Sequence, residues 1–358
     1  MIPASRHSGL TDNYIASTAS PVGTGTPDEG ETCWQRELAA ANVSIAELLA
    51  RLQIPLQHYS AAAITDRRLA RFPLRVTESF IRRMRMGDIE DPLLRQILPV
   101  VDELASAPGY SDDPLQENAY NMAPGLIHKY RSRALLIVTQ ACAVHCRYCF
   151  RKEFPYQENR ASQSNWEPAL QHLRNDPSIR EVILSGGDPL AVSDRHLGGL
   201  LKLIAGIAHV KRLRIHTRLP VVLPSRITGN LLQAIQQVQK KCVLVVHCNH
   251  SAELNAEVGA ALAKLKTNGI TLLNQAVLLR GVNDSVAVQV ELAECLFDHG
   301  VLPYYLHQLD KVSGTSHFEV SDERARAIHA GMRDELAGYL LPRLVREVPG
   351  AMSKLPVF

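Results

Sequence analysis

Short apolar runs alternate with amphipathic stretches from residue 134 onward. The apolar runs are Ala134–Val138, Glu181–Leu184, Leu213–His216, Val243–His247, Thr271–Val277 and Leu302–Leu306. Between them, helical spacing of apolar residues marks Trp166–Leu173, Leu197–Ile207, Gly229–Val238, Ala256–Lys266 and Val286–Phe297. Continuous apolar strands that alternate with helices predict an α/β fold with a helix-covered parallel sheet. Six units are too few for an eight-stranded barrel, so we expect a partial (β/α)6 barrel with functional residues at the carboxyl ends of its strands.

The chain before this region has a different pattern. Residues 1–32 are rich in Ser, Thr, Gly, Pro and Asp and predict a flexible tail. Residues 33–120 predict a helical lead-in without a catalytic signature: Ser44 begins a capping box, Val76–Met84 suggests a helix, and Asp91-Pro92 starts another. We expect residues 121–358 to form the catalytic core.

Composition limits the class of protein. The chain has 358 residues, of which 46% are hydrophobic and 21% charged, as in ordinary globular proteins. No apolar run approaches the roughly 20 residues that cross a bilayer, so we expect no membrane association. The net charge of +3 gives no reason to expect nucleic-acid binding. Scattered cysteines without an export signal predict a cytoplasmic protein.

Three cysteines follow the first apolar run of the core. Cys142, Cys146 and Cys149 have the spacing CxxxCxxC. Thiolates bind iron–sulfur clusters, and a cubane cluster normally takes four cysteines, so three would leave one iron open to a small molecule. Buried apolar cysteines, or a zinc site completed by His145, are the alternatives, although no second ligand pair follows at zinc-finger distance. The spacing therefore favours a [4Fe-4S] cluster.

A second motif follows the next apolar run. It consists of Ser185, Gly186, Gly187 and Asp188. The glycines allow a ligand to approach the backbone closely, and the carboxylate can hold an ammonium group. Taken alone, the motif indicates a tight turn as readily as a binding site.

The cysteine loop and this glycine motif together resemble the radical S-adenosylmethionine (SAM) enzymes, in which the open iron binds SAM. From about residue 70 to 358 the chain resembles one group of them, the lysine 2,3-aminomutase family. The segments that carry the resemblance are Pro124–Arg133, Gln275–Asp284, Tyr304–Asp310 and Glu347–Val357, which contains Lys354. This family also uses pyridoxal 5′-phosphate (PLP), whose π-system can accept a migrating radical.

The resemblance implies a role for each matching residue. Cys142, Cys146 and Cys149 match the cluster ligands, and Lys354 matches the lysine that binds PLP. Residues that match positions near PLP are Tyr130 and Arg133. Arg151 matches the arginine for the substrate α-carboxylate, and Asp310 and Glu347 match acids for its ε-ammonium. The SAM site would comprise Tyr148, Ser185, Gly186, Gly187, Asp188, Asn249 and Gln275.

The implied activity is isomerisation of L-lysine to β-lysine by radical migration of the α-amino group. The chain departs from the family pattern at Glu347, usually Asp, and at Gly350-Ala-Met-Ser, usually richer in glycine. It also ends four residues after Lys354, without a zinc-binding cysteine extension. These features resemble the branch that makes (R)-β-lysine for elongation factor P.

In that branch, a lysyl-tRNA-synthetase-like ligase attaches the product to elongation factor P, and we expect a reductase as electron donor. Three alternatives remain open: an aminomutase that supplies β-lysine as a metabolite, a glutamate 2,3-aminomutase, and a non-catalytic iron–sulfur or zinc module. Asp310 and Glu347 disfavour glutamate because like charges in a partly buried site are costly.

Overall fold

The computed structural model describes residues 33–154 and 166–358. The predicted tail, residues 1–32, lies outside this range. Residues 33–358 form one compact unit, and none of the described helices is both long and apolar enough to span a bilayer.

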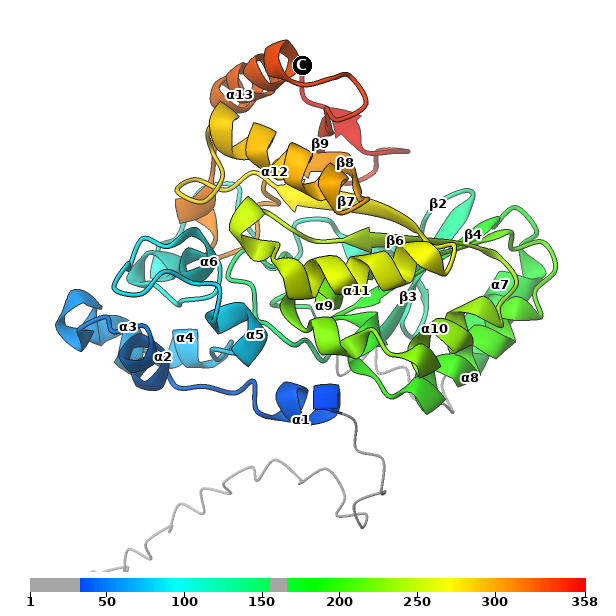
Figure 1. Cartoon of the computed structure of the whole chain (residues 1–358). Coiled ribbons are helices and arrows are strands. Elements are labelled where there is room, and N and C mark those ends of the chain that lie inside the picture. Colours follow the sequence, from blue (N-terminus) through cyan, green and yellow to red (C-terminus); the bar gives the residue numbers. More distant parts are fainter. Residues whose placement is uncertain (1–32, 155–165) are drawn as a thin grey trace, which may run out of the picture. The chain divides into compact units, whose positions relative to one another are not determined.

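A single open sheet forms the centre of this unit (Figure 1). Its neighbouring strands follow chain order from β1 to β10, and β3 to β9 are parallel, whereas the β1–β2, β2–β3 and β9–β10 pairs are antiparallel. The strands are β1 (Asn121–Ala123), β2 (Leu126–Tyr130), β3 (Arg133–Thr139), β4 (Glu181–Gly186), β5 (Arg212–Thr217), β6 (Lys241–Val246), β7 (Thr271–Val277), β8 (Leu302–His307), β9 (Arg343–Arg346) and β10 (Leu355–Pro356). The six apolar runs coincide with β3 to β8, which confirms the partial (β/α)6 barrel.

Helices after the strands cover the outside of the curved sheet (Figure 1). Side chains of Ser193, Thr228, Asn255 and Ser285 cap four of them by accepting a backbone N–H of the first turn. The helices are α7 (Trp166–Asn175), α8 (Asp194–Ala205), α9 (Leu219–Val222), α10 (Gly229–Gln236), α11 (Ala256–Thr267), α12 (Val286–Asp298) and α13 (Asp322–Glu335). The predicted helical stretches correspond to α7, α8, α10, α11 and α12.

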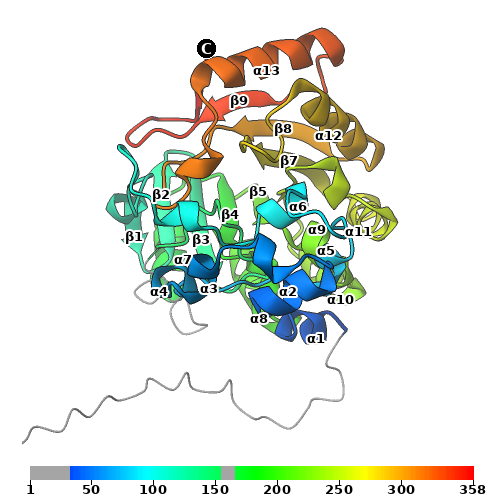
Figure 2. The same ribbon diagram turned by 90° about the vertical axis from the view of Figure 1, so that its left-hand side faces the viewer.

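The lead-in consists of short helices (Figure 2). They are α1 (Cys33–Ala39), α2 (Ile45–Arg51), α3 (Ala61–Thr65), α4 (Arg67–Ala70), α5 (Glu78–Ile81) and α6 (Pro92–Arg95), with 3-10 turns η1 (Leu56–His58), η2 (Val101–Leu104) and η3 (Glu117–Tyr120). Ser44 and Asp91 cap α2 and α6 as predicted. The helix predicted over Val76–Met84 is shorter, because Thr77 caps it and its helical bonds end near Ile81. The core boundary at residue 121 stays a prediction.

Candidate active site at the carboxyl ends of the strands

The three cysteines lie in the loop that follows β3. All three are free and half-buried. Burial, together with neighbouring thiols, raises the pKa of the Cys142 thiol well above its usual value and that of Cys149 to about 11. A positively charged group that binds the thiolates would offset both effects, so these side chains fit an iron–sulfur cluster.

The lead-in holds this loop in place. The guanidinium of Arg147, between the cysteines, donates to both carboxylate oxygens of Glu103 in η2, from Nε to Oε1 at 2.8 Å and from Nη2 to Oε2 at 2.6 Å. Both side chains are 2% exposed. Nε of Arg75 donates to the Cys142 carbonyl at 2.6 Å. A segment that lacked any catalytic signature in the sequence thus supports the loop that carries the cysteines.

The glycine motif at the end of β4 supports the same loop. Gly187 N donates to Thr139 O at 2.7 Å, and Asp188 N donates to Ala141 O at 2.8 Å. A Cβ on Gly186, whose φ is +127°, would lie 2.4 Å from Thr139 O. The glycines are therefore required for the close approach of the loop.

We expect Gly187→Ala to destabilise the protein by about 1–3 kcal/mol and to reduce cluster incorporation. Its Cβ would lie 2.5 Å from the Ala141 and Gln140 carbonyl oxygens, so the loop backbone must shift. Urea unfolding and iron content measure the two effects. Gly229→Ala is the matched control, because a Cβ there has nothing within 4 Å. Equal behaviour of the two variants would contradict this prediction.

Asp188 is engaged by the protein on both oxygens. Oδ1 accepts from Thr217 Oγ1 at 2.7 Å and from Leu190 N at 3.0 Å, and Oδ2 accepts from Arg218 N at 2.7 Å. Burial raises its pKa to about 6, although these hydrogen bonds lower it in part. Asp188 therefore joins the ends of β4 and β5, in addition to the contact with SAM that the resemblance implies.

Two further SAM candidates belong to a buried polar network. Asn249, after β6, donates from Nδ2 to the Tyr148 hydroxyl at 2.7 Å and to Gln96 Oε1 at 3.0 Å. Arg218, after β5, donates to Gln96 Oε1 at 2.7 Å, to Glu253 Oε2 at 2.9 Å and to Cys146 Sγ at 2.8 Å. The network connects three strand ends with the lead-in and reaches one of the cysteines. The guanidinium of Arg218 supplies positive charge at the Cys146 sulfur, which favours the thiolate form that binds metal.

Gln275 and three histidines lie near the carboxyl ends of β5 to β8. His216 is the last residue but one of β5, His247 follows β6, and His307 is the last residue of β8. Gln275 Nε2 lies 3.2 Å from His247 Nε2. Burial, with nearby cationic side chains, lowers the pKa of His247 to about 3 and those of the other two well below normal. These rings are therefore neutral at physiological pH.

Lys354, immediately before β10, pairs with an acid. Its Nζ pairs with Glu347 Oε2 and lies 5.9 Å from the centre of the Tyr305 ring. Burial alone would raise the pKa of Glu347, but the ammonium groups of Lys354 and Lys129 outweigh it and lower that pKa. Tyr130 OH donates to Glu347 Oε1 at 3.0 Å, and Lys129 Nζ lies 3.1 Å from the same oxygen.

The surroundings of Lys354 fit PLP. The guanidinium carbon of Arg133 lies 4.3 Å from the centre of the Tyr130 ring. The cations of Lys129 and Arg133 suit a phosphate, the tyrosines suit a flat ring, and the amine of Lys354 suits an aldehyde. The structure thus brings together the residues that the sequence assigned to PLP and adds Lys129 and Tyr305.

Arg151 and the two acids line two cavities. Glu347 and Asp310 line one of about 520 Å³, and Arg151 lines the other, of about 250 Å³. Pro114 and Leu115 line both. The two acids therefore share a cavity.

Arg151 already has a carboxylate partner. Its Nε and Nη2 donate to the two oxygens of Glu117 at 2.8 and 2.7 Å, and its Nη1 donates to Ser185 Oγ at 3.0 Å. A substrate carboxylate must therefore compete with Glu117 or bind beside it.

Burial raises the pKa of Asp310 to about 7 from an ordinary value of 3.8. Between pH 3.8 and about 7, Asp310 is protonated in the folded state but ionised in the unfolded state. The free energy of unfolding therefore falls as the pH rises through this range. We expect Asp310→Asn to remove this loss. The free energy of unfolding of wild type minus that of the variant should fall between pH 4 and 7. Exposed Asp334→Asn is the control, and a difference that does not change with pH would contradict the assignment.

Sequence reasoning missed several residues at this edge of the sheet. Arg218 and the three histidines lie at or just after strand ends, and the strand pattern could have identified them. Lys129 adjoins Tyr130, whereas Gln96, Glu103, Glu117 and Glu253 carry no local signal.

Comparisons with known proteins identify the family of this chain. The family model of a 4Fe-4S single cluster domain matches residues 131–255, which contain the cysteine loop. L-lysine 2,3-aminomutase of Escherichia coli K12 is 48% identical over 324 residues, 90% of this chain and 94% of that protein. That of Buchnera aphidicola is 44% identical over 90% of this chain and 94% of that protein, and that of Clostridium subterminale is 38% identical over 79% and 68%. The chain therefore belongs to the lysine 2,3-aminomutase family of radical SAM enzymes.

Proposed function

We propose that this protein is an isomerase that converts L-lysine to (R)-β-lysine with a [4Fe-4S] cluster, SAM and PLP. The observation that carries this proposal is that Lys354, Glu347 and Asp310 lie close together. They lie at the carboxyl ends of the parallel strands, where the cysteine loop also lies. An amine for PLP and two acids for a cationic side chain thus lie on the same side of the sheet as the cluster ligands.

Each residue has a proposed role. Cys142, Cys146 and Cys149 hold the cluster, and Lys354 binds PLP beside Tyr130 and Arg133. When bound, the cluster and SAM would supply the radical that starts the reaction, and PLP would supply a carrier for the migrating nitrogen. The SAM site comprises Tyr148, Ser185, Gly186, Gly187, Asp188, Asn249 and Gln275.

The protein itself positions the substrate. Arg151 binds the α-carboxylate in competition with Glu117, and Asp310 and Glu347 bind the ε-ammonium. Lys354, which would hold PLP, and Lys129 both pair with Glu347, so the substrate's ammonium group would share this carboxylate with them. The charge of Lys129 helps to keep Glu347 ionised. The neutral histidines add no charge to compete with these contacts.

A substrate panel tests the proposed activity. The reconstituted enzyme, with SAM, PLP and a reductant under anaerobic conditions, is incubated with L-lysine or L-glutamate, and the products are separated by chiral chromatography. We expect β-lysine from L-lysine and no β-glutamate. Asp310→Lys should abolish lysine turnover while cluster and PLP content stay at wild-type levels. Turnover of glutamate, or unchanged lysine turnover in the variant, would refute the substrate assignment.

We further propose that the product is attached to elongation factor P by a lysyl-tRNA-synthetase-like ligase, with a cellular reductase as electron donor. In support, identity is higher to the Escherichia coli relative, at 48%, than to the clostridial one, at 38%. The seven free cysteines suit the reducing cytoplasm. Mass spectrometry of elongation factor P after incubation with ligase and enzyme tests this role. An unmodified factor despite β-lysine formation would favour the metabolite alternative.

A further inference from the structure

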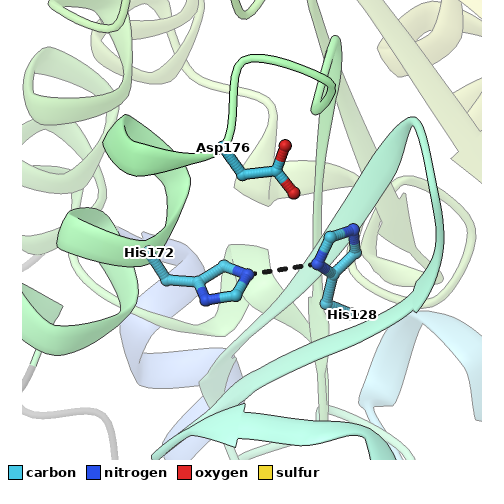
Figure 3. Close-up of side chains that lie close together, drawn as sticks. All are labelled: His128, His172 and Asp176. Carbon is cyan, nitrogen blue, oxygen red and sulfur yellow. Dashed lines mark hydrogen bonds between the residues drawn. The ribbon is translucent and has the colours of Figure 1, made fainter.

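A cluster of potential metal ligands lies apart from the proposed active site. His128 on β2, His172 on α7 and Asp176 just after α7 each offer one ligand atom, and these atoms all lie within 4.8 Å of one another. The three side chains point toward one another from the two elements (Figure 3). We propose that they bind one first-row transition-metal dication, with Zn²⁺ the best fit, which fastens α7 to β2.

The geometry is close to that of a zinc site. His128 Nδ1 lies 3.1 Å from His172 Nε2. With Zn–N bonds of about 2.0–2.1 Å, two ligands of a tetrahedral ion lie about 3.3–3.4 Å apart, so the rings need to move only a few tenths of an ångström. Two imidazoles and a carboxylate, with water in the open position, form a common zinc ligand set.

The hydrogen bond between the rings leaves His128 incompletely satisfied. Its buried Nε2 has no hydrogen-bond partner within residues 33–154 and 166–358. Nε2 lies across the ring from Nδ1, so a metal ion bound at Nδ1 would not contact it, and Nε2 would then carry the ring proton as an N–H donor.

The carboxylate is held in place by the turn that follows α7. Ser178 N donates to Asp176 Oδ1 at 2.9 Å, and Ser178 Oγ donates to Arg131 O at 3.0 Å. The turn after α7 is thus tied to the turn after β2, so that the ligands from the two elements are preorganised.

The proposed metal has a structural rather than a catalytic role. His128 precedes Lys129 and Tyr130 on β2, and both of these residues contact Glu347. A metal on His128 would therefore restrict the strand that carries part of the PLP site. The proposal stands even if the substrate is not lysine.

Zinc binding to the holoenzyme tests the proposal. Enzyme with its cluster and PLP is exposed anaerobically to Zn²⁺ and dialysed, and zinc, iron and sulfide are counted by elemental analysis. We expect about one zinc ion per chain in wild type, and at least tenfold weaker binding in His172→Ala and in the isosteric Asp176→Asn. Zn²⁺ should also raise the Tm of wild type but of neither variant.

His196→Ala is the matched control. His196 lies on α8, and its ring packs on Trp166 of α7, the helix that carries His172, with centroids 4.6 Å apart. It takes no part in the cluster, so this variant should retain zinc. Zinc bound at cysteines that lack iron would persist in the His172 and Asp176 variants. Equal zinc content in all four proteins, or none in wild type, would overturn the proposal.

Discussion

Replacing Lys354 with alanine should lower turnover of lysine by a factor on the order of 10³ or more, because removal of a covalently acting residue typically costs this much. The variant should also lose the adduct between protein and PLP that borohydride reduction traps. Liquid chromatography of β-lysine measures the first effect, and mass spectrometry of the reduced peptide measures the second. Retention of the trapped adduct in the variant would show that another lysine binds PLP.

Two further variants separate chemistry from structure. Lys354→Arg keeps a cation opposite Glu347 but cannot form the adduct, so it should be inactive and close to wild type in stability. Lys211→Ala removes an exposed lysine whose Nζ donates to Ala208 O at 2.8 Å, before the start of β5, and it should keep both activity and adduct. A large loss of stability in Lys354→Arg would mean that the lysine mainly holds the β9–β10 segment in place.

The strands and most helices of the core could be predicted because their signals are local. β4 is buried along its whole length, and its centre, Val182–Leu184, is an apolar run of β-branched and aliphatic residues. The elements that were missed have weak patterns. In α13 only Ala325, Ile328 and Met332 are buried, so its apolar stripe is sparse, and β9 is four residues long with arginine at both ends.

The residues of the candidate site likewise divide into those that a local sequence signal marks and those that only the fold brings together. Cys142, Cys146 and Cys149 are identified by spacing, and Lys354 by its resemblance to the family motif. The supporting residues act across long stretches of chain: Gln96 reaches Asn249, and Glu117 reaches Arg151. Only the fold determines such contacts, because neither residue type nor spacing marks them. The partner of Arg151 is the most consequential of these for the proposed function, in which Glu117 would compete with a substrate carboxylate for Arg151.

Among these long-range contacts, the pair between Arg147 and Glu103 should matter most for stability. We expect Arg147→Met to lower the free energy of unfolding by about 3–5 kcal/mol, because it leaves the Glu103 carboxylate buried without its partner. Lys152, whose Nζ lies 3.9 Å from Glu103, is too far away to replace the two short hydrogen bonds. Since Arg147 lies between Cys146 and Cys149, iron content should fall together with stability. Urea unfolding of the cluster-free protein and iron analysis of the reconstituted protein measure the two losses separately.

The double variant Arg147→Met/Glu103→Gln shows whether the loss comes from the stranded charge. It should recover most of the lost stability, because replacing both members of a buried pair with neutral groups is often nearly neutral. Arg174→Met removes an exposed partner of Glu167 and should change stability by about 1 kcal/mol or less. If the double variant regains stability without regaining iron, the pair positions the cysteine loop itself. A loss below about 1 kcal/mol in Arg147→Met would instead mean that the lead-in holds the loop through its other contacts, such as Arg75 with the Cys142 carbonyl.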